Sequence, residues 1–278
     1  MSKACIIGWP VAHSRSPIIH GYWLRTYAIS GSYGRQPVRP GEVGQFLASM
    51  PALGLAGCNV TLPHKEAAFA AAERKLPGAR AVGAANTLWY EDGVLACDNT
   101  DGAGFMSHLA ASAPGFKARD CGVASILGAG GAARAIVHAF LSAGVHEVRL
   151  FNRTRARADE LAAFFGPRVQ AYDWSRAMAC SVDVGILVNA TTLGMQGGGG
   201  RLEFDVAALN ASCVVADLVY VPLLTPLLAA AKARGLTTVD GLGMLLHQAV
   251  PGFEKWFGVR PQVTHELRDL LVADLGRS

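Results

Sequence analysis

Lys65 is the first residue whose position suggests chemistry. It closes the segment Asn-Val-Thr-Leu-Pro-His-Lys, residues 59–65, in which a strand would end near residue 60 and a helix would begin after Pro63. The positive end of the helix dipole lies in that first turn and disfavours an ammonium group. Lys65 therefore needs a nearby carboxylate or a catalytic role. The alternative is that Lys65 is an exposed lysine without a function.

Asp101 can supply that carboxylate. It lies in Cys-Asp-Asn-Thr-Asp-Gly, residues 97–102, just before a predicted helix. An ammonium beside a carboxylate can hold and deliver a proton, which is general acid–base chemistry. The alternative role for Asp101 is to cap that helix. Asn86 is predicted to end another strand and to point its carboxamide toward the same crevice, with turn formation as its alternative.

Two serines precede the first predicted helix. Ser14 and Ser16 stand two residues apart, directly before Pro17, and a proline suits the first turn of a helix. Their hydroxyls can cap the helix or bind a carboxylate at its free N–H groups. Thr61 shares one face with Asn59 at the end of the strand that leads to Lys65.

A glycine-rich turn follows a buried strand near residue 127. Gly128-x-Gly130-x-x-Ala133 fits the dinucleotide-binding fingerprint, in which glycines allow a tight turn and let backbone N–H groups approach a pyrophosphate. A turn that merely tolerates glycine is the alternative.

The end of the following strand indicates which dinucleotide would bind. An acidic residue would hold the ribose hydroxyls of NAD there, but this chain has Arg153, Thr154 and Arg157. Two guanidinium groups and a hydroxyl suit a 2′-phosphate. The sequence therefore favours NADP over NAD as the cofactor. The alternative is that these basic residues are only solvated side chains at the start of a helix.

The elements that would position these residues alternate between strand and helix. The first hundred residues contain strand patterns at 4–8 and 56–60 and helical patterns at 17–28 and 65–75, which favours an open βαβ-type domain. A second unit runs as strand, glycine turn, helix and strand over residues 121–151, with further strands at 184–188 and 213–219. The last thirty residues are predicted to be mainly helical, and a domain boundary is expected near residues 102–105.

Composition agrees with an enzyme of this kind. The 278 residues are 51% apolar and 17% charged, and 25 Lys and Arg against 21 Asp and Glu give a formal charge of +4, scattered without blocks. Nucleic acid binding is therefore not expected. Six widely spaced cysteines without a metal-ligand pattern indicate free thiols and no metal site. The sequence shows no signal peptide and no apolar stretch of membrane length, so a cytoplasmic protein is expected.

Together these segments resemble the shikimate dehydrogenase family over nearly the whole chain. The resemblance rests on an ordered set of motifs present here: H-S-x-S-P, N-V-T-x-P-x-K, G-A-x-N-T, N-T-D-x-x-G, G-A-G-G-A-A, N-R-T-x-x-R-A, N-A-T-x-x-G-M, D-x-x-Y-x-P-x-x-T-P-L and M-L-x-x-Q-A. So many motifs in one order do not arise by chance, and the purely structural roles given above as alternatives for single residues are therefore disfavoured.

The resemblance implies a role for each matching residue. Lys65 and Asp101 would be the catalytic pair, while Ser14, Ser16 and Tyr220 would hold the substrate carboxylate. The ring hydroxyls would be held by Thr61, Asn86, Asp101 and Gln248. The NADP site would be lined by Gly128, Ala129, Gly130, Gly131, Ala132, Asn152, Arg153, Thr154, Arg157, Leu218 and Gly241.

We therefore expect an α/β fold of two domains. Residues 1–104 would form an open βαβ-type substrate domain that is completed by the C-terminal helices in 245–278, and residues 105–244 would form a Rossmann-type NADP-binding domain. The expected reaction is the reversible NADP-dependent reduction of 3-dehydroshikimate to shikimate in aromatic amino-acid (chorismate) biosynthesis, by a monomer or homodimer without a metal.

Three alternative functions fit the sequence less well. A quinate/shikimate dehydrogenase with broader substrate or cofactor use is disfavoured by the paired serines and by Arg153 with Arg157. A short-chain reductase is disfavoured because no lysine has a tyrosine four residues before it. A non-catalytic NADP-binding regulatory protein is disfavoured by the presence of Lys65 and Asp101.

Overall fold

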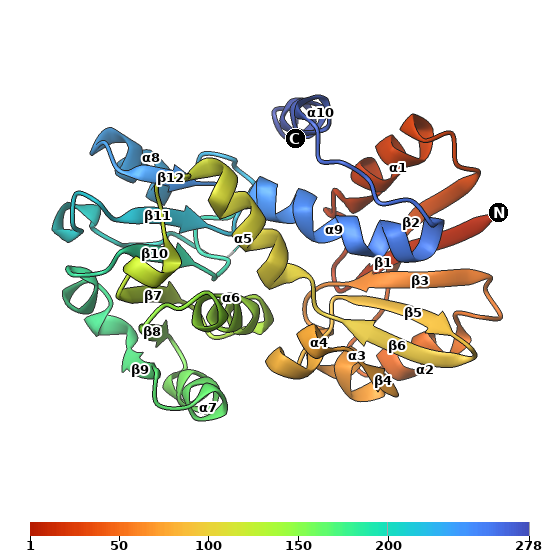
Figure 1. Ribbon diagram of the computed structural model, residues 1–278, viewed down its shortest axis with the longest axis horizontal. Coiled ribbons are helices and arrows are strands. Elements are labelled where there is room, and N and C mark those ends of the chain that lie inside the picture. Colours follow the sequence, from red (N-terminus) through yellow and green to blue (C-terminus); the bar gives the residue numbers. More distant parts are fainter. Residues whose placement is uncertain (199, 278) are drawn as a thin grey trace. The chain divides into compact units, whose positions relative to one another are not determined.

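The chain forms two compact units. A computed structural model describes residues 1–198 and 200–277. The first unit comprises Met1–Gly104 and Leu245–Arg277, and the second comprises Phe105–Met244 (Figure 1). Helix α5 (Asp101–Ser112) leads out of the first unit, and helix α9 (Gly241–Phe257) leads back into it. Residue 278, the last residue of the predicted first domain, lies outside the described residues.

The first unit is built on a mixed six-stranded sheet. Its strands are β1 (Ser2–Gly8), β2 (Gly31–Pro37), β3 (Leu55–Val60), β4 (Arg74–Lys75), β5 (Thr87–Glu91) and β6 (Val94–Asp98), in the order β2-β1-β3-β5-β6-β4. Strand β1 pairs in parallel with β2 and β3, whereas β5 pairs antiparallel with β3 and β6. The sheet is thus parallel around β1, contains the antiparallel hairpin of β5 and β6, and ends at β4, which pairs in parallel with β6.

Two local predictions for this unit were wrong. The helix expected over 65–75 is α3 (Lys65–Ala71), and Arg74 and Lys75 instead pair with Ala96 and Cys97 of β6. Asn86 does not end a strand but precedes β5. In the first case pairing with β6, which is distant in sequence, overrides the local pattern. In the second case Thr87 pairs with Asn59 of β3 and Asp98 of β6, so the strand begins just after Asn86.

Helices cover both faces of this sheet. Side chains from α2 (Val43–Ser49), α3 and α4 (Pro77–Val82) pack with Cys5, Ile7 and Leu88 on one face. The neighbouring strand residues Ala4 and Trp89 point the other way, because side chains alternate along a strand, and they pack with Trp256 of α9. Helix α1 (Ser16–Thr26) lies on this second face.

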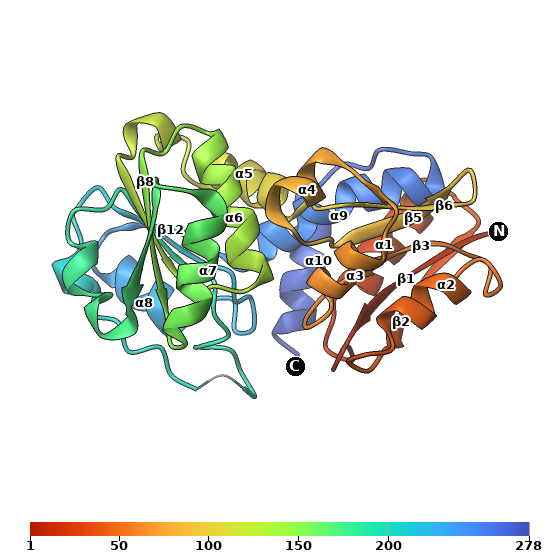
Figure 2. The ribbon, with the colours of Figure 1, turned by 90° about the horizontal axis from the view of Figure 1, so that it is seen from below.

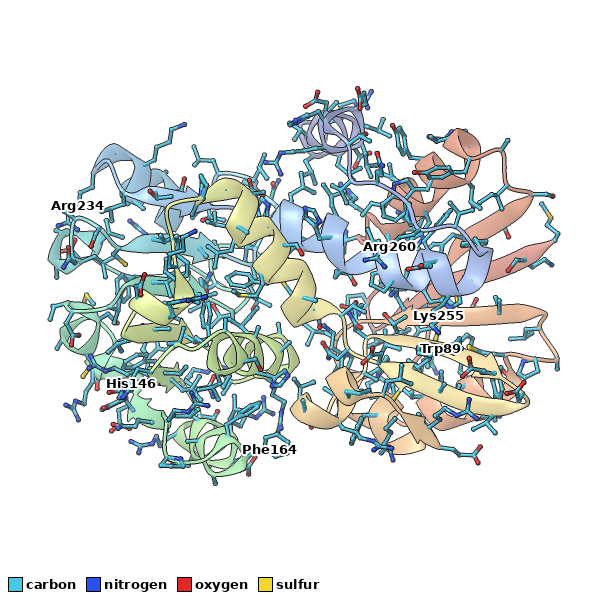
Figure 3. All side chains as sticks on the ribbon, in the orientation of Figure 1. Trp89, His146, Phe164, Arg234, Lys255 and Arg260 are labelled. Carbon is cyan, nitrogen blue, oxygen red and sulfur yellow. The ribbon has the colours of Figure 1, made fainter. Side chains whose placement is uncertain are left out.

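The C-terminal helices complete the first unit. The Trp256 indole donates a hydrogen bond to the Leu88 carbonyl over 3.0 Å, and the Lys255 ammonium lies 4.8 Å from the centre of the Trp89 ring (Figure 3). Helix α10 (His265–Leu275) is capped by Thr264 and contacts α1. Residues after 244 are therefore part of the core of the first unit.

The second unit is a parallel six-stranded sheet. Its strands are β7 (Val123–Leu127), β8 (Glu147–Asn152), β9 (Val169–Asp173), β10 (Ile186–Asn189), β11 (Val214–Asp217) and β12 (Thr237–Val239), in the order β12-β11-β10-β7-β8-β9. Helices α5, α6 (Gly131–Ser142) and α7 (Arg155–Phe165) pack on one face, and α8 (Pro226–Ala233) packs on the other (Figures 1 and 2).

The strand order reverses between β7 and β10 in this sheet. The chain builds outward from β7 to β9 and then returns to β10 on the opposite side. Ligands of open parallel sheets bind at the carboxyl ends of strands beside such a reversal. The turn after β7 begins at Gly128, so the predicted glycine motif lies at this position. Among the described residues, no helix combines the length and apolar character needed to cross a membrane.

Candidate active site

Lys65 and Asp101 meet at the starts of two helices. Lys65 is the first residue of α3 and Asp101 is the first residue of α5. The Lys65 Nζ atom donates to Asp101 Oδ2 over 2.5 Å, and only 13% and 6% of the two side chains are exposed. The carboxylate thus offsets the unfavourable helix dipole at Lys65, and the pair can hold a proton at the surface of a largely buried polar cluster.

Asn86 joins this pair from the position just before β5. Its Nδ2 atom donates to Asp101 Oδ1 over 2.9 Å. Although Asn86 precedes β5, that strand runs antiparallel to β3, with Asn59 opposite Thr87. The start of β5 therefore lies at the same sheet edge as the end of β3, and Asn86 reaches the predicted cluster.

Thr100 and Gln248 surround the Asn86 carboxamide. The Asn86 Nδ2 atom lies 2.9 Å from Thr100 Oγ1 and 3.2 Å from Gln248 Oε1, in addition to Asp101. An amide nitrogen has two hydrogens for these three acceptors. The longest contact, to Gln248, is the one that an incoming hydroxyl could replace most readily.

The serines and Thr61 follow strands at the same edge. Ser14 and Ser16 come after β1, and Ser16 begins α1 with 1% of its surface exposed. The Ser16 N–H donates to Ser14 Oγ over 3.3 Å, and Arg35 of β2 donates to the Ser14 carbonyl over 2.6 Å. Thr61 directly follows β3, and its N–H donates to the Ile7 carbonyl.

The glycine turn of the second unit has the geometry that a dinucleotide needs. Gly128 has a φ of +111°, and a Cβ atom there would meet the Ala190 backbone at the end of β10. Helix α6 begins at Gly131, and the space beside Gly130 is open. Backbone N–H groups at the start of α6 are thus accessible to a phosphate. Ala129 and Ala132 lie within the same turn.

The basic residues after β8 are suited to an anion. Asn152 ends β8, and its Nδ2 atom donates to the Thr154 carbonyl over 2.8 Å. Arg153 and Arg157 are exposed, and within residues 1–198 and 200–277 neither forms an ion pair, whereas Arg155 pairs with Asp159. Two free guanidinium groups next to a helix start match the chemistry of a 2′-phosphate.

Leu218, Tyr220 and Gly241 follow the neighbouring strands of the second unit. Leu218 comes directly after β11, and a Cβ atom on Gly241 would meet its carbonyl. These two predicted cofactor residues are therefore in close contact. Tyr220 also follows β11 and belongs to the second unit, whereas Ser14 and Ser16 belong to the first.

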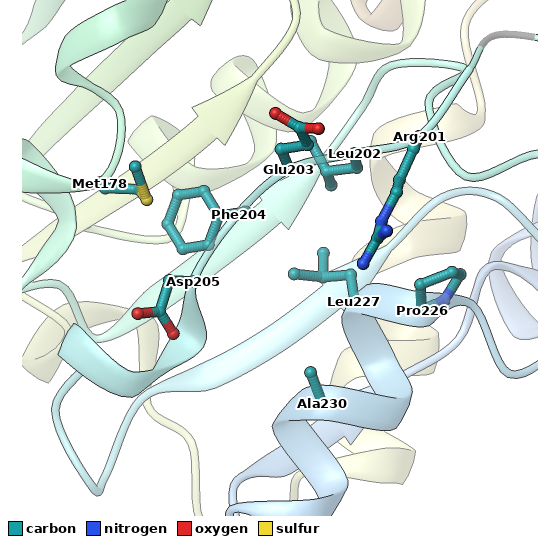
Figure 4. A pocket seen from close by; sticks show the side chains of 9 residues that line it. All are labelled: Met178, Arg201, Leu202, Glu203, Phe204, Asp205, Pro226, Leu227 and Ala230. Carbon is teal, nitrogen blue, oxygen red and sulfur yellow. The ribbon is translucent and has the colours of Figure 1, made fainter.

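A separate cavity of about 430 Å³ lies in the second unit (Figure 4). It is lined by Met178, Arg201, Leu202, Glu203, Phe204, Asp205, Pro226, Leu227 and Ala230. All of these differ from the residues predicted for catalysis, substrate or cofactor, so this cavity is not the predicted site.

Three family models match the chain in succession. The model described as shikimate dehydrogenase substrate binding domain matches residues 6–88, shikimate / quinate 5-dehydrogenase matches 102–194, and shikimate 5′-dehydrogenase C-terminal domain matches 241–265. A curated shikimate dehydrogenase (NADP(+)) of Azorhizobium caulinodans is 56% identical over 275 residues, covering 99% of this chain and 97% of that protein. The chain belongs to the shikimate dehydrogenase family.

Solved structures of the family share this fold. Shikimate 5-dehydrogenase of Thermus thermophilus, in complex with NADP(H) and shikimate, is 34% identical with a TM-score of 0.85 and covers 99% of this chain and 100% of that one. Quinate dehydrogenase of Corynebacterium glutamicum, in complex with NAD, is 28% identical with a TM-score of 0.88 and covers 98% and 100%. The expected family and the expected two-domain α/β fold are confirmed.

Part of the polar cluster had no predicted role. Thr87 and Thr100 are buried beside Asn86, but neither was predicted as a site residue. Asn59 was noted only for the face it shares with Thr61. Each of the three belongs to a family motif quoted above, so the motifs contained the signal, but a threonine beside a candidate residue has no chemistry of its own to draw attention.

Proposed function

We propose that this chain catalyses the reversible NADP-dependent reduction of 3-dehydroshikimate to shikimate. The observation that carries the proposal is the contact of Lys65 with Asp101, beside the Asn86 carboxamide and in a chain of the shikimate dehydrogenase family. Lys65 and Asp101 form the acid–base pair. The cofactor, when bound, would supply the hydride as NADPH or accept it as NADP⁺.

Lys65 handles the proton at the oxygen that is reduced. Its ammonium donates a proton to that oxygen in one direction, and the neutral amine accepts it in the other. Positive charge at this position also stabilises the negative charge that develops on the oxygen. Asp101 orients Lys65 through their hydrogen bond and binds a ring hydroxyl.

The other predicted residues bind the ends of the substrate. Thr61, Asn86 and Gln248 bind the ring hydroxyls. The contact between the Asn86 amide and Gln248 is the longest of the three that the amide makes, so a substrate hydroxyl can replace it most readily. The carboxylate is taken by Ser14, Ser16 and Tyr220.

The second unit holds the cofactor in this proposal. The turn at the start of α6 would hold the pyrophosphate with Gly128, Ala129, Gly130, Gly131 and Ala132. Arg153, Thr154 and Arg157 take the 2′-phosphate. Asn152, Leu218 and Gly241 complete the cofactor site. Residues 105–244 are accordingly the NADP-binding domain, and residues 1–104 with the C-terminal helices are the substrate domain.

Two broader attributes belong to the same proposal. The reaction places the enzyme in aromatic amino-acid biosynthesis, and the proposed location is the cytoplasm, where the six cysteines would remain free thiols. The proposed assembly is a monomer or a homodimer.

An activity matrix tests the proposal. Purified protein is assayed with shikimate and quinate against NADP and NAD. The highest kcat/KM is expected for shikimate with NADP. Comparable values with quinate or with NAD would favour a broader quinate/shikimate dehydrogenase, and no turnover in any combination would favour a non-catalytic NADP-binding protein.

Lys65→Ala tests the catalytic pair. It is expected to lower kcat by about 10²- to 10⁴-fold with a much smaller effect on KM for shikimate, because proton transfer occurs in the transition state. The exposed Lys232 on α8 provides a control, and Lys232→Ala is expected to match the wild type. Normal turnover by Lys65→Ala would remove Lys65 from the mechanism.

A further inference from the structure

We propose that Tyr33, Asn59 and Thr87 form a positioning line that orients Asn86 and, through it, Asp101. The inference rests on the proposed function, since it assigns a task to residues behind the acid–base pair. All of the residues involved lie in the first unit. None of the three was predicted as a site residue.

The line begins at the Tyr33 hydroxyl. It donates to Asn59 Oδ1 over 2.6 Å, because an amide oxygen can only accept. Asn59 Nδ2 in turn donates to the Asn86 carbonyl over 3.2 Å and to Thr87 Oγ1 over 3.3 Å. The opposite orientation of the Asn59 amide would set its oxygen against the Asn86 carbonyl oxygen, so the hydrogens of Asn59 point toward Asn86 and Thr87.

The line continues through Thr87 to the acid. Since Thr87 Oγ1 accepts from Asn59, its single hydrogen goes to Asn86 Oδ1, which lies 3.0 Å away. Asn86 Oδ1 also accepts from the Thr100 N–H over 2.9 Å. Both donors hold the oxygen of the carboxamide on one side, so the Asn86 Nδ2 atom must face Asp101.

Each member of the line therefore donates one hydrogen bond in the direction of the Asp101 carboxylate. Tyr33 donates to Asn59, Asn59 to Thr87, Thr87 to Asn86, and Asn86 to Asp101, which also accepts from Lys65. Hydrogen bonds aligned in one direction polarise and strengthen one another in surroundings of low dielectric constant. A line that ends on an anion gains most from this alignment.

Burial makes the line costly to break. Asn59, Asn86 and Thr87 are 3%, 2% and 1% exposed, so water cannot replace a lost partner. The Tyr33 ring is fixed by stacking on His20, with ring centres 3.8 Å apart and planes 6° apart. Burial lowers the pKa of His20 to about 3, so the stack carries no charge at neutral pH.

Thr87→Val tests the line at its centre. Valine has nearly the same shape as threonine but can neither accept from Asn59 nor donate to Asn86. We expect kcat with shikimate and NADP to fall about tenfold while KM for NADP stays unchanged, because only the first unit is altered. Thr87→Ser restores the hydroxyl and is expected to return kcat to within about twofold of the wild type.

Tyr33→Phe tests the start of the line with a smaller change. It is expected to lower kcat about threefold, because Asn59 keeps its contacts to Asn86 and Thr87. Tyr90→Phe is the matched control, since the Tyr90 hydroxyl in the same unit donates to the Leu47 carbonyl outside the line. Tyr90→Phe is expected to leave kcat unchanged.

A double-mutant comparison shows whether the line acts through Asp101. In an Asp101→Asn background, Thr87→Val is expected to cause little further loss of kcat, whereas independent residues would show multiplied losses. Multiplied losses would overturn the proposal, as would wild-type kcat in Thr87→Val or a loss that Thr87→Ser does not rescue. Failure of the proposed function is distinct from these results, because the wild-type enzyme itself would then be inactive.

Discussion

At the scale of single residues, the site depends on polar groups that satisfy one another. Lys65 begins a helix where a positive charge is disfavoured, and it is kept there by Asp101. Asp101 in turn accepts from Asn86, so each group of the triplet depends on the next. Removing one partner leaves a largely buried charge or amide unpaired, which costs more than the bond itself contributes.

The basic residues after β8 allow a test of cofactor choice. Arg153→Ala is expected to reduce the preference for NADP over NAD by about 10- to 100-fold, because one or two charge-assisted hydrogen bonds to a phosphate contribute a factor of this size. The measurement is the ratio of kcat/KM for the two cofactors. Arg155 is the matched control at the same helix start, because it is engaged with Asp159 and Asp173. An unchanged ratio in Arg153→Ala, or an equal change in Arg155→Ala, would refute this assignment.

At the scale of elements, Asp217 joins three parts of the second unit. It ends β11 and accepts from Asn189 of β10 over 2.9 Å and from Thr225, the cap of α8, over 2.7 Å. Only 1% of Asp217 is exposed. Burial raises the pKa of this carboxyl from 3.8 to about 6, although its hydrogen bonds act in the opposite direction.

The raised pKa of Asp217 predicts a pH-dependent stability. A carboxyl with a higher pKa in the folded state favours folding fully below its unfolded pKa, and this contribution is lost as pH rises through the folded pKa. The loss amounts to about 2 kcal/mol between pH 4 and pH 7. Asp217→Asn removes the titrating carboxyl and with it this pH dependence. The free energy of unfolding of the variant, relative to that of the wild type, is therefore expected to increase as pH rises.

Urea unfolding at several pH values measures this difference. Asp183 provides a control of opposite sign, because its hydrogen bond to Arg149 lowers the pKa of the carboxyl. Asp183→Asn should therefore lose relative stability as pH rises through the acidic range. A stability difference between Asp217→Asn and the wild type that does not vary with pH would contradict the prediction.

At the scale of the whole molecule, each unit has its own core, but only the second is continuous in sequence. The second unit is built from residues 105–244, whereas the first needs residues 245–277. Trp256 and Phe253 pack among aromatic residues of the first unit, and Gln248 reaches Asn86. The proposed substrate site is therefore complete only when the end of the chain has folded back.

A fragment of residues 105–244 tests the proposed division of labour. It is expected to fold alone and to bind NADPH without binding shikimate, because the proposed cofactor residues and their supporting core lie within it. Fluorescence of bound NADPH measures cofactor binding, and calorimetry with shikimate measures substrate binding. A folded fragment that binds shikimate, or one that fails to bind NADPH, would contradict the proposed domains.

Much of this organisation follows from the sequence. The alternation of strands and helices, the glycine turn at Gly128 and the start of a helix at Lys65 are all local, because each depends on residues a few positions apart. Lys65, Asp101 and Asn86 could be picked out for the same reason, since each is a polar or charged residue at or just before the start of an element.

Only the tertiary structure decided how distant segments pair. Strand β4 arises from pairing with β6, and β5 pairs antiparallel with β3, and no local pattern encodes either of these two pairings. The line from Tyr33 to Asp101 likewise joins residues from separate segments of the first unit. A buried hydrogen bond needs a partner at the right distance and angle, and in a folded chain that partner is set by packing and not by its position in the sequence.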